Sequence, residues 1–447
     1  MTALPDGYAR RALLPALLVL AFGAAFYKVA RHPVPARFQW PNPDMEVVRA
    51  APVLRTHFVS QRQNISTHAA SLVELGDGRL RAFWFAGSKE GAADVEIRTA
   101  VFDPSSDSWS AETGVTERMN TQRALLRFVK KIGNPVPYRA ADGTLWLFYV
   151  TVTLGGWAGS SITAIISRDD GTTWEPARRL ITSPFLNIST LVKGTPFSYA
   201  DGTIGLPVYH EFIGKFGELL RLSPSGAVLD KQRLSSGRSA IQPVLLVKDQ
   251  QQAIILMRHT GATPKRVIAT STYDAGMHWS TPEKTALPNP DAAVAGVALP
   301  DGRLLLALND TETNREVLSL TASSDGGATW QTLMQLEDQR NRSAGPETYM
   351  QRAAKLALQT EPEIANPAAF GASARLAKCH GEGCGFEFSY PYLIHASNGE
   401  FHLVYTWNRS FIKHVRFTSA WLGQRIRSVE QDSPNDSNME VSNAALH

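Results

Sequence analysis

Short apolar runs separated by glycine-containing turns dominate the chain. Runs such as 79–85, 144–149 and 401–405 have the length and the aromatic and branched content typical of β-strands. Each follows a turn of the Asp-Gly or Asn-Gly type, the strongest short-range signal for a hairpin. These turns stand at Asp77-Gly78, Asp142-Gly143, Asp201-Gly202, Asp301-Gly302 and Asn398-Gly399. Their spread along the chain predicts repeated antiparallel sheets rather than one sandwich.

A second repeat has the pattern S/T-x-D-x-G-x-x-W. It occurs at Ser167–Trp174, Thr272–Trp279 and Ser323–Trp330, with a degenerate copy at Asp103–Trp109. The carboxylate of each Asp can accept backbone N–H groups of the turn, and the Gly supplies a left-handed position. We expect Trp174, Trp279 and Trp330 to be buried at equivalent places on three separate sheets, far from any active centre.

The N-terminal segment has the pattern of a signal anchor or a signal peptide. Arg10 and Arg11 precede an apolar run at 12–27, and Lys28 and Arg31 follow it. We therefore predict contact with a membrane through residues 12–30, or cleavage and secretion. In the anchored case the positive-inside rule places the large domain outside the cytoplasm, in the periplasm if the cell is bacterial.

Composition narrows the class of protein. Hydrophobic residues make up 43% of the chain and charged residues 19%, which is ordinary for a globular protein. The formal net charge is +4, but no dense basic stripe with interleaved aromatic residues is present, so we predict no binding to nucleic acid. Oligomeric state cannot be predicted from these features.

Two cysteines stand close together, Cys379 and Cys384. In an oxidising compartment they could form a disulfide. With His380 they could instead supply metal ligands, but a structural zinc site needs four ligands and no second cluster completes one. We favour the disulfide, and we expect neither a metal nor an organic cofactor.

The domain boundaries follow from these patterns. Residues 1–31 form the N-terminal segment, 32–46 a linker, 47–421 the folded domain and 422–447 a disordered tail. An insertion at 333–388 interrupts the strand pattern, with a helical stretch at 353–358. We expect this insertion on the active-site face.

The repeated motif resembles the Asp box of the sialidase superfamily, and the resemblance covers roughly residues 55–420. Several other segments resemble the predicted neuraminidase-like branch with BNR repeats. They are 68–74, 84–91, 209–211, 389–393 and 405–409. The resemblance implies an all-β fold, a six-bladed β-propeller.

The same resemblance implies a site. Arg258 and Arg315 correspond to two of the three arginines with which sialidases hold a substrate carboxylate. Tyr390 corresponds to the nucleophilic tyrosine, and Glu90 or Asp94 to the acid/base residue.

Two positions depart from the family pattern. His68 stands where the first arginine is expected, and Gln242 stands where a glutamate activates the tyrosine. Glutamine cannot accept the phenolic proton. Further candidates are Glu211 as an assisting carboxylate, and Trp407 and Arg409 as substrate-binding residues.

The leading hypothesis is an exo-acting glycoside hydrolase on an acidic-sugar glycan outside the cytoplasm. A polysaccharide lyase acting on a uronic acid is a second enzymatic reading, with His and Tyr moving the protons. A non-catalytic glycan-binding propeller used in envelope polysaccharide assembly is a third.

Overall fold

The computed structural model describes residues 6–30, 35–40, 51–183, 187–235, 237–380 and 383–432. β-Strands are the commonest secondary structure among these residues and helices are few, which confirms the all-β prediction. In chain order the strands fall into six successive antiparallel units of four or five strands, which we call blades 1 to 6; a short parallel pairing of residues 215–216 with 239–240 joins blades 3 and 4 into one sheet.

Each blade is an antiparallel meander, and its strands are numbered here from the inside outward. The first strands of blades 1 to 6 are β2 (Ser66–Glu74), β7 (Lys131–Arg139), β11 (Leu191–Val192) with β12 (Phe197–Ser198), β16 (Ser239–Val247), β20 (Ala295–Ala298) and β26 (Phe388–His395). The second strands are β3 (Leu80–Gly87), β8 (Leu145–Val152), β13 (Ile204–His210), β17 (Ala253–His259), β21 (Leu304–Leu308) and β27 (Glu400–Trp407).

The outer strands follow in the same order. The third strands are β4 (Glu96–Asp103), β9 (Ser160–Ser167), β14 (Lys215–Leu222), β18 (Arg266–Thr272), β22 (Val317–Ser323) and β28 (Phe411–Thr418). The fourth strands are β5 (Ser108–Trp109) with β6 (Thr113–Glu117), β10 (Arg178–Arg179), β15 (Val228–Arg233), β19 (Glu283–Pro288), β23 (Gln331–Asp338) and β1 (Leu54–Phe58).

The blades follow one another in a ring. Strand β2 contacts β7 and β26, β7 contacts β11, β13 contacts β16, and β20 contacts both β16 and β26. The ring closes because β1, from the start of the domain, pairs with β28 of blade 6. Blades 3 and 6 are therefore three steps apart in either direction, so β11 and β26 face each other across the axis.

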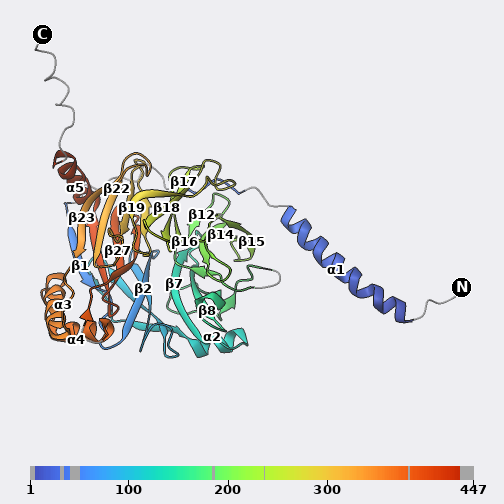
Figure 1. Ribbon diagram of the computed structural model, residues 1–447, viewed down its shortest axis with the longest axis horizontal. Coiled ribbons are helices and arrows are strands. Elements are labelled where there is room, and N and C mark those ends of the chain that lie inside the picture. The colour runs from blue at the N-terminus through green and yellow to red at the C-terminus, as the bar shows by residue number, and fades with distance from the viewer. Residues whose placement is uncertain are drawn as a thin grey trace, which may run out of the picture.

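The antiparallel order gives the ring two distinct faces. The turns between first and second strands and the Asp-box turns lie on one face. The connections between second and third strands, and those from one blade to the next, lie on the opposite face, which we call the site face. Helices α2 (Arg118–Leu125), α3 (Pro346–Thr360) and α4 (Pro367–Lys378) belong to blade-to-blade connections and lie on the same side in Figure 1.

All five predicted Asp-Gly or Asn-Gly turns join a first strand to a second strand, and each glycine has a positive φ. The Asp boxes join third to fourth strands in blades 2, 4 and 5. In each, the carboxylate accepts a backbone N–H four residues on: Asp169 from Thr173 at 2.8 Å, Asp274 from His278 and Asp325 from Thr329 at 2.9 Å.

The tryptophans of the Asp boxes are less buried than predicted. Trp174, Trp279 and Trp330 are all half-buried, packed against the edges of hydrophobic clusters. The reason is geometric, because each turn lies beyond the end of its blade, so one side of each ring faces solvent.

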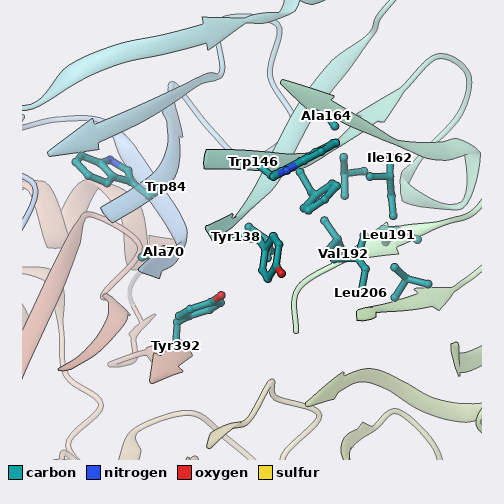
Figure 2. Packing of buried hydrophobic residues seen from close by; sticks show 14 of the residues in the cluster. Ala70, Trp84, Tyr138, Trp146, Ile162, Ala164, Leu191, Val192, Leu206 and Tyr392 are labelled. Carbon is teal, nitrogen blue, oxygen red and sulfur yellow. The ribbon is translucent and has the colours of Figure 1, made fainter. Parts of the chain in front are cut away.

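The hydrophobic core lies inside and between the blades. Figure 2 shows Tyr138, Val192 and Tyr392, from three different blades, gathered in one part of the interior. A second large cluster joins blades 5 and 6 to α3 and α4 through Tyr349, Phe370 and their neighbours. The insertion at 333–388 is thus a packed helical unit that includes the end of β23, whereas only residues 353–358 were predicted to be helical.

The cysteines of this insertion form the predicted disulfide. Cys379 and Cys384 lie in the short paired strands β24 (Cys379–His380) and β25 (Gly383–Cys384), with an S–S distance of 1.97 Å. Within the described ranges, no group of three or more His, Cys, Asp or Glu residues is placed to hold a metal ion.

The N-terminal segment forms helix α1 (Asp6–Ala30). Among the residues that the structure describes, no helix is long and apolar enough to cross a membrane. The predicted linker is partly anchored: Phe38 is buried, pairs with Tyr199 and stacks on its ring at 5.5 Å. The rest of the linker lies largely outside the described residues.

The tail prediction is wrong for its first part. Residues 419–432 form helix α5 (Ser419–Asp432), and Leu422 and Ile426 are buried against the cluster of blades 5 and 6. Leu422 and Ile426 are four positions apart, so they lie on one face of a helix. The polar residues around them made this pattern hard to recognise in the sequence. Residues 433–447 lie outside the described residues.

Candidate active site

Six non-glycine residues with left-handed backbone conformation lie at or just before the first strands, one in each blade. Their φ angles fall between 48° and 59°. In β2, β7, β16 and β26 they occupy a β-bulge. They are Ala69, Asn134, Ser189, Gln242, Asp291 and Tyr390. Bulges re-aim side chains, and these four bulges lie where their strands meet the site face.

Tyr390 lies at the centre of this arrangement. Its phenolic oxygen accepts hydrogen bonds from Nη1 of Arg258 and from Nε2 of Gln242, each at 3.2 Å. Arg258 also donates from Nε to Asp291 at 2.6 Å and from Nη1 to Gln242 Oε1 at 3.2 Å. Three of the left-handed residues, Gln242, Asp291 and Tyr390, are thus joined through one guanidinium group.

Tyr209, on β13, extends this network toward blade 2. Its hydroxyl accepts from Gln242 Nε2 and from Asn134 Nδ2, each at 3.4 Å. Burial raises the pKa of Tyr209 well above its usual value, and the neighbouring Tyr390 and Glu211 raise it further. Tyr209 is therefore a neutral phenol that fixes the amide of Gln242 beside Tyr390.

Arg315 and Arg409 meet at a buried carboxylate, Glu387. Arg409 donates to Oε1 from Nε at 2.8 Å, Arg315 donates to Oε1 from Nη1 at 3.4 Å, and Lys378 donates to Oε2 at 2.7 Å. Burial alone would raise the pKa of Glu387, but Arg409, Lys378 and Arg315 outweigh it and hold this pKa well below the ordinary value. Glu387 is therefore a permanent anion facing three cations.

Arg315 also connects this ion cluster to Tyr390. Its guanidinium carbon lies 5.9 Å from the centre of the Tyr390 ring, and its Nη2 donates to the backbone oxygen of Asp291 at 2.6 Å. The sequence predicted that Arg258 and Arg315 share one site. The structure brings them together around Asp291 and Tyr390.

His68 packs against the ring of Tyr390, with 4.2 Å between ring centres. It is almost fully buried, and its Nδ1 lies 2.9 Å from Thr406 Oγ1. Burial, followed by the charge of Arg409, lowers the pKa of His68 well below its usual value. His68 is therefore neutral at physiological pH and does not replace the missing arginine as a cation.

The three candidate carboxylates have different surroundings. Glu90 is exposed and pairs with Arg409 at 2.6 Å. Asp94 is turned toward Ser88, whose N–H and hydroxyl each donate to it at 2.9 Å. Desolvation raises the pKa of Asp94, but these hydrogen bonds outweigh it and the net shift is downward. Asp94 makes no described contact with the Tyr390 network.

Glu211 is the carboxylate best placed to hold a proton. It follows β13, and its N–H donates to the hydroxyl of Ser189, another of the left-handed residues, at 2.8 Å. Burial raises the pKa of Glu211, opposed by Lys215 and Arg258. Glu211 is thus more readily protonated than an exposed glutamate.

Trp407 is not part of the site. It is fully buried in the cluster of blade 6, against Phe58 and Phe411. The prediction that it binds substrate is wrong: its ring points into the interior of the blade, although it lies two residues before Arg409, which does reach the site.

Sequence reasoning missed four residues that the structure brings to the site: Lys193, Tyr209, Asp291 and Glu387. A lone charge between phenylalanines, as in Phe386-Glu387-Phe388, is a usable signal of a buried ion. Lys193 and Asp291 carry no such signal, because their placement depends on how the six first strands meet. Tyr209 lies in a recognised segment, but nothing in its neighbours marks its role.

Comparison with solved structures defines the class of fold. A Hadza microbial sialidase, Hz136, superposes with a TM-score of 0.57 at 15% identity, covering 79% of this chain and 66% of that one. The NanB sialidase from Streptococcus pneumoniae gives 0.55 at 10% identity, covering 86% and 71%. A protein of unknown function from Dyadobacter fermentans gives 0.58 at 11% identity, covering 82% and 100%.

These similarities show that the protein has a sialidase-like fold. The BNR repeat-like domain model matches residues 78–403, so the chain belongs to the BNR repeat-like family. The chain spans slightly less than two thirds of the length of Hz136. No curated protein matches it significantly.

Proposed function

We propose that the protein is a sialidase-like glycoside hydrolase, a six-bladed propeller that removes a terminal acidic sugar from a glycan. The observation that carries the proposal is the hydroxyl of Tyr390, which accepts hydrogen bonds from Arg258 and Gln242 at the meeting point of the first strands. The guanidinium N–H and the amide N–H hold this oxygen in one position at the centre of the site. A tyrosine oxygen positioned in this way can act as the nucleophile in covalent catalysis.

The proposed reaction has two displacements. In the first, Tyr390 gives its hydroxyl proton to water and its oxygen bonds to the anomeric carbon, while the bond to the leaving oxygen breaks and Glu211 gives the leaving oxygen a proton. In the second, water attacks the anomeric carbon, Glu211 takes a proton from that water, and the bond to Tyr390 breaks to leave a phenolate that regains a proton from solvent. The raised pKa of Glu211 suits a proton donor better than the lowered pKa of Asp94 does.

The charge of the site supports an acidic substrate. Arg315, Arg409 and Lys378 share the single carboxylate of Glu387, and among the described residues Glu90 pairs only with Arg409. Within the described part of the chain, Nη2 of Arg258 has no hydrogen-bond partner. The N–H groups of this one nitrogen can donate a charge-assisted hydrogen bond to a carboxylate.

One observation favours a second candidate, a glycan-binding protein without turnover. Gln242 stands beside Tyr390 where a proton acceptor would be needed, and His68 packs against the Tyr390 ring with its Nδ1 near Thr406. Among the described residues, the Tyr390 hydroxyl has no carboxylate or imidazole partner. Its proton would have to pass to water or to the substrate.

We also propose that α1 attaches the domain to a membrane outside the cytoplasm, or directs its export. The support is the apolar character of the helix surface, on which Leu14, Val19 and Phe26 are exposed. Fractionation of cells that express the full chain, with and without residues 1–31, tests this location separately from the activity.

A panel of glycosides tests the proposed reaction. The full chain is incubated with fluorogenic glycosides of sialic acids and of hexuronic acids, and with the matching neutral sugars, and the products are identified by mass spectrometry. We expect release of the intact acidic sugar and none of the neutral ones. An unsaturated uronate, which absorbs ultraviolet light, would indicate a lyase. Saturable binding without any product would favour the glycan-binding alternative.

A further inference from the structure

Lys193 is a buried amine with no assigned role. It directly follows β11, in blade 3, and only 4% of its surface is exposed. A lysine is rarely buried to this degree without a carboxylate partner. Its Nζ instead donates to the backbone oxygen of Pro391 at 3.1 Å.

That hydrogen bond crosses the axis of the molecule. Pro391 lies in β26 of blade 6, which faces β11 across the ring of first strands. The Lys193 side chain therefore links two opposite blades that share no sheet. Its Nζ also lies 5.7 Å from the ring centre of Tyr390 and 5.1 Å from that of Tyr392.

The hydrogen bond from Lys193 ends in the β-bulge of β26, which sets the direction of the Tyr390 side chain. The register of β26 against β27 shifts between Ser389 and Tyr392, and Tyr390 has a φ of 55°. A left-handed conformation is unfavourable for a residue as bulky as tyrosine and persists only where its surroundings hold it. Lys193 binds the backbone oxygen of Pro391, the residue directly after Tyr390.

The base of the Lys193 side chain is fixed as well. Gly194 follows it, and a Cβ at that position would lie 2.1 Å from the backbone oxygen of Pro243 and 2.9 Å from Cβ of Pro207. Only glycine permits this close packing against blade 4. The lysine is thus held at both ends.

We infer that Lys193 is a positioning residue for Tyr390: it pins the bulge of β26 from the opposite blade and keeps a positive charge beside the Tyr390 ring. The inference rests on the proposed role of Tyr390 in turnover. Burial lowers the pKa of Lys193 to about 7, so this charge is present on only part of the molecules at neutral pH.

Other charged groups also face Tyr390, so the contribution of Lys193 has to be isolated. Arg258 donates to its hydroxyl, Arg315 lies over its ring, and neutral His68 packs against it. Arg409 acts on it through charge. None of these four residues is changed in a variant that replaces only Lys193.

The test records the near-ultraviolet spectrum of the Tyr390 ring between pH about 5 and about 9, the range in which Lys193 loses its charge, and it does not depend on turnover. Ultraviolet difference spectra of each protein against its Tyr390→Phe counterpart isolate this one tyrosine. The proteins compared are the wild type, Lys193→Met and Lys193→Arg, with Lys413→Met as the control. Lys413 is also a buried lysine, but it pairs with Glu337 at 2.7 Å.

We expect the Tyr390 spectrum of the wild type to change with a midpoint near pH 7, as Lys193 loses its charge, and that of Lys193→Met to show no such change. Lys193→Met should also reduce kcat at least tenfold with KM changed less than threefold. Lys193→Arg should keep the acidic-pH spectrum throughout and restore kcat in part, and Lys413→Met should behave as the wild type. If Lys193→Met does not fold, Lys193→Gln takes its place. The same pH dependence of the Tyr390 spectrum in the wild type and in the folded variant would overturn the inference. The wild-type spectral change in a protein that turns over no glycoside would uphold it and refute the proposed function.

Discussion

The phenolic oxygen of Tyr390 and Nη1 of Arg258 lie 3.2 Å apart, although the two residues are 132 positions apart in the chain. Arg258 is the last residue but one of β17 in blade 4, and Tyr390 is the third residue of β26 in blade 6. Asp291, from blade 5, holds the guanidinium from the other side. Three blades thus fix one hydrogen bond, and the proposed chemistry depends on it.

Arg258→Lys should impair the site although it keeps the positive charge. An ammonium group cannot reach Asp291, Gln242 and Tyr390 together as the planar guanidinium does. We expect kcat/KM on an acidic-sugar glycoside to fall by about 100-fold or more, which corresponds to about 3 kcal/mol. Arg303→Lys, which alters only a pair with Asp301 in a surface turn, is the control and should leave kcat/KM unchanged. Equal activity of the two variants would show that Arg258 does not serve the reaction.

Glu387→Gln should lower stability at neutral pH by about 3–5 kcal/mol, because it removes the anion that Arg315 and Lys378 face and leaves Arg409 with Glu90 alone. The pKa of Glu387 is lower in the folded state than in the unfolded chain, so its stabilisation is complete above the ordinary pKa of about 4.3 and is lost as pH falls below it. Urea unfolding at several pH values measures this. A difference between wild type and variant that stays constant from pH about 7 to about 3 would contradict the assignment.

Three buried histidines should make the protein sensitive to acid. Burial lowers the pKa of His68 and His414 well below the usual value and that of His402 to about 3. Because the unfolded chain takes up protons below pH about 6.5 and the folded histidines do not, stability falls as pH falls, by up to about 1.4 kcal/mol per pH unit for each.

His402→Gln isolates one of these contributions. Trp109 donates to Nδ1 of His414 at 3.2 Å, so Nε2 of His414 carries the hydrogen that points to Nδ1 of His402 at 3.0 Å. We expect the slope of unfolding free energy against pH to decrease by up to about 1.4 kcal/mol per pH unit between pH about 6 and about 4. An unchanged slope would mean that His402 is protonated in the folded protein.

Trp279→Ala tests the structural role of the Asp boxes. The ring is half-buried and its Nε1 donates to Gln232 at 3.2 Å. We expect a loss of about 1–3 kcal/mol in unfolding free energy, less than for a fully buried tryptophan. The specific activity of the folded variant should equal that of the wild type. Lost activity with unchanged stability would place Trp279 in the function instead.

Local sequence signals predicted the architecture well. An Asp-Gly turn or an Asp box depends on residues a few positions apart, so the five hairpins and three repeats could be read without knowledge of the rest of the chain. Helix α5 and the docking of Phe38 were missed, because both are decided by a distant partner. Leu422 and Ile426 meet the cluster of blades 5 and 6, and Phe38 meets Tyr199.

Only part of the site could be predicted, because many of its contacts join residues that are far apart in the sequence. Resemblance located His68, Gln242, Arg258, Arg315 and Tyr390, which the structure brings together. It did not reveal that Glu387 forms ion pairs with Arg315 and Arg409, or that Lys193 reaches across the axis. Those contacts depend on which first strands face each other, which no short segment specifies.

The most direct test of the account is Tyr390→Phe, measured beside Tyr349→Phe. The Tyr349 hydroxyl is buried and, among the described residues, has no hydrogen-bond partner, so its removal should leave both activity and folding intact. Tyr390→Phe keeps the ring that packs on His68 and removes only the oxygen that Arg258 and Gln242 bind. The account predicts that kcat for release of an acidic sugar falls by about 1,000-fold in Tyr390→Phe, with its unfolding midpoint close to that of the wild type. Equal kcat for Tyr390→Phe and the wild type would contradict it.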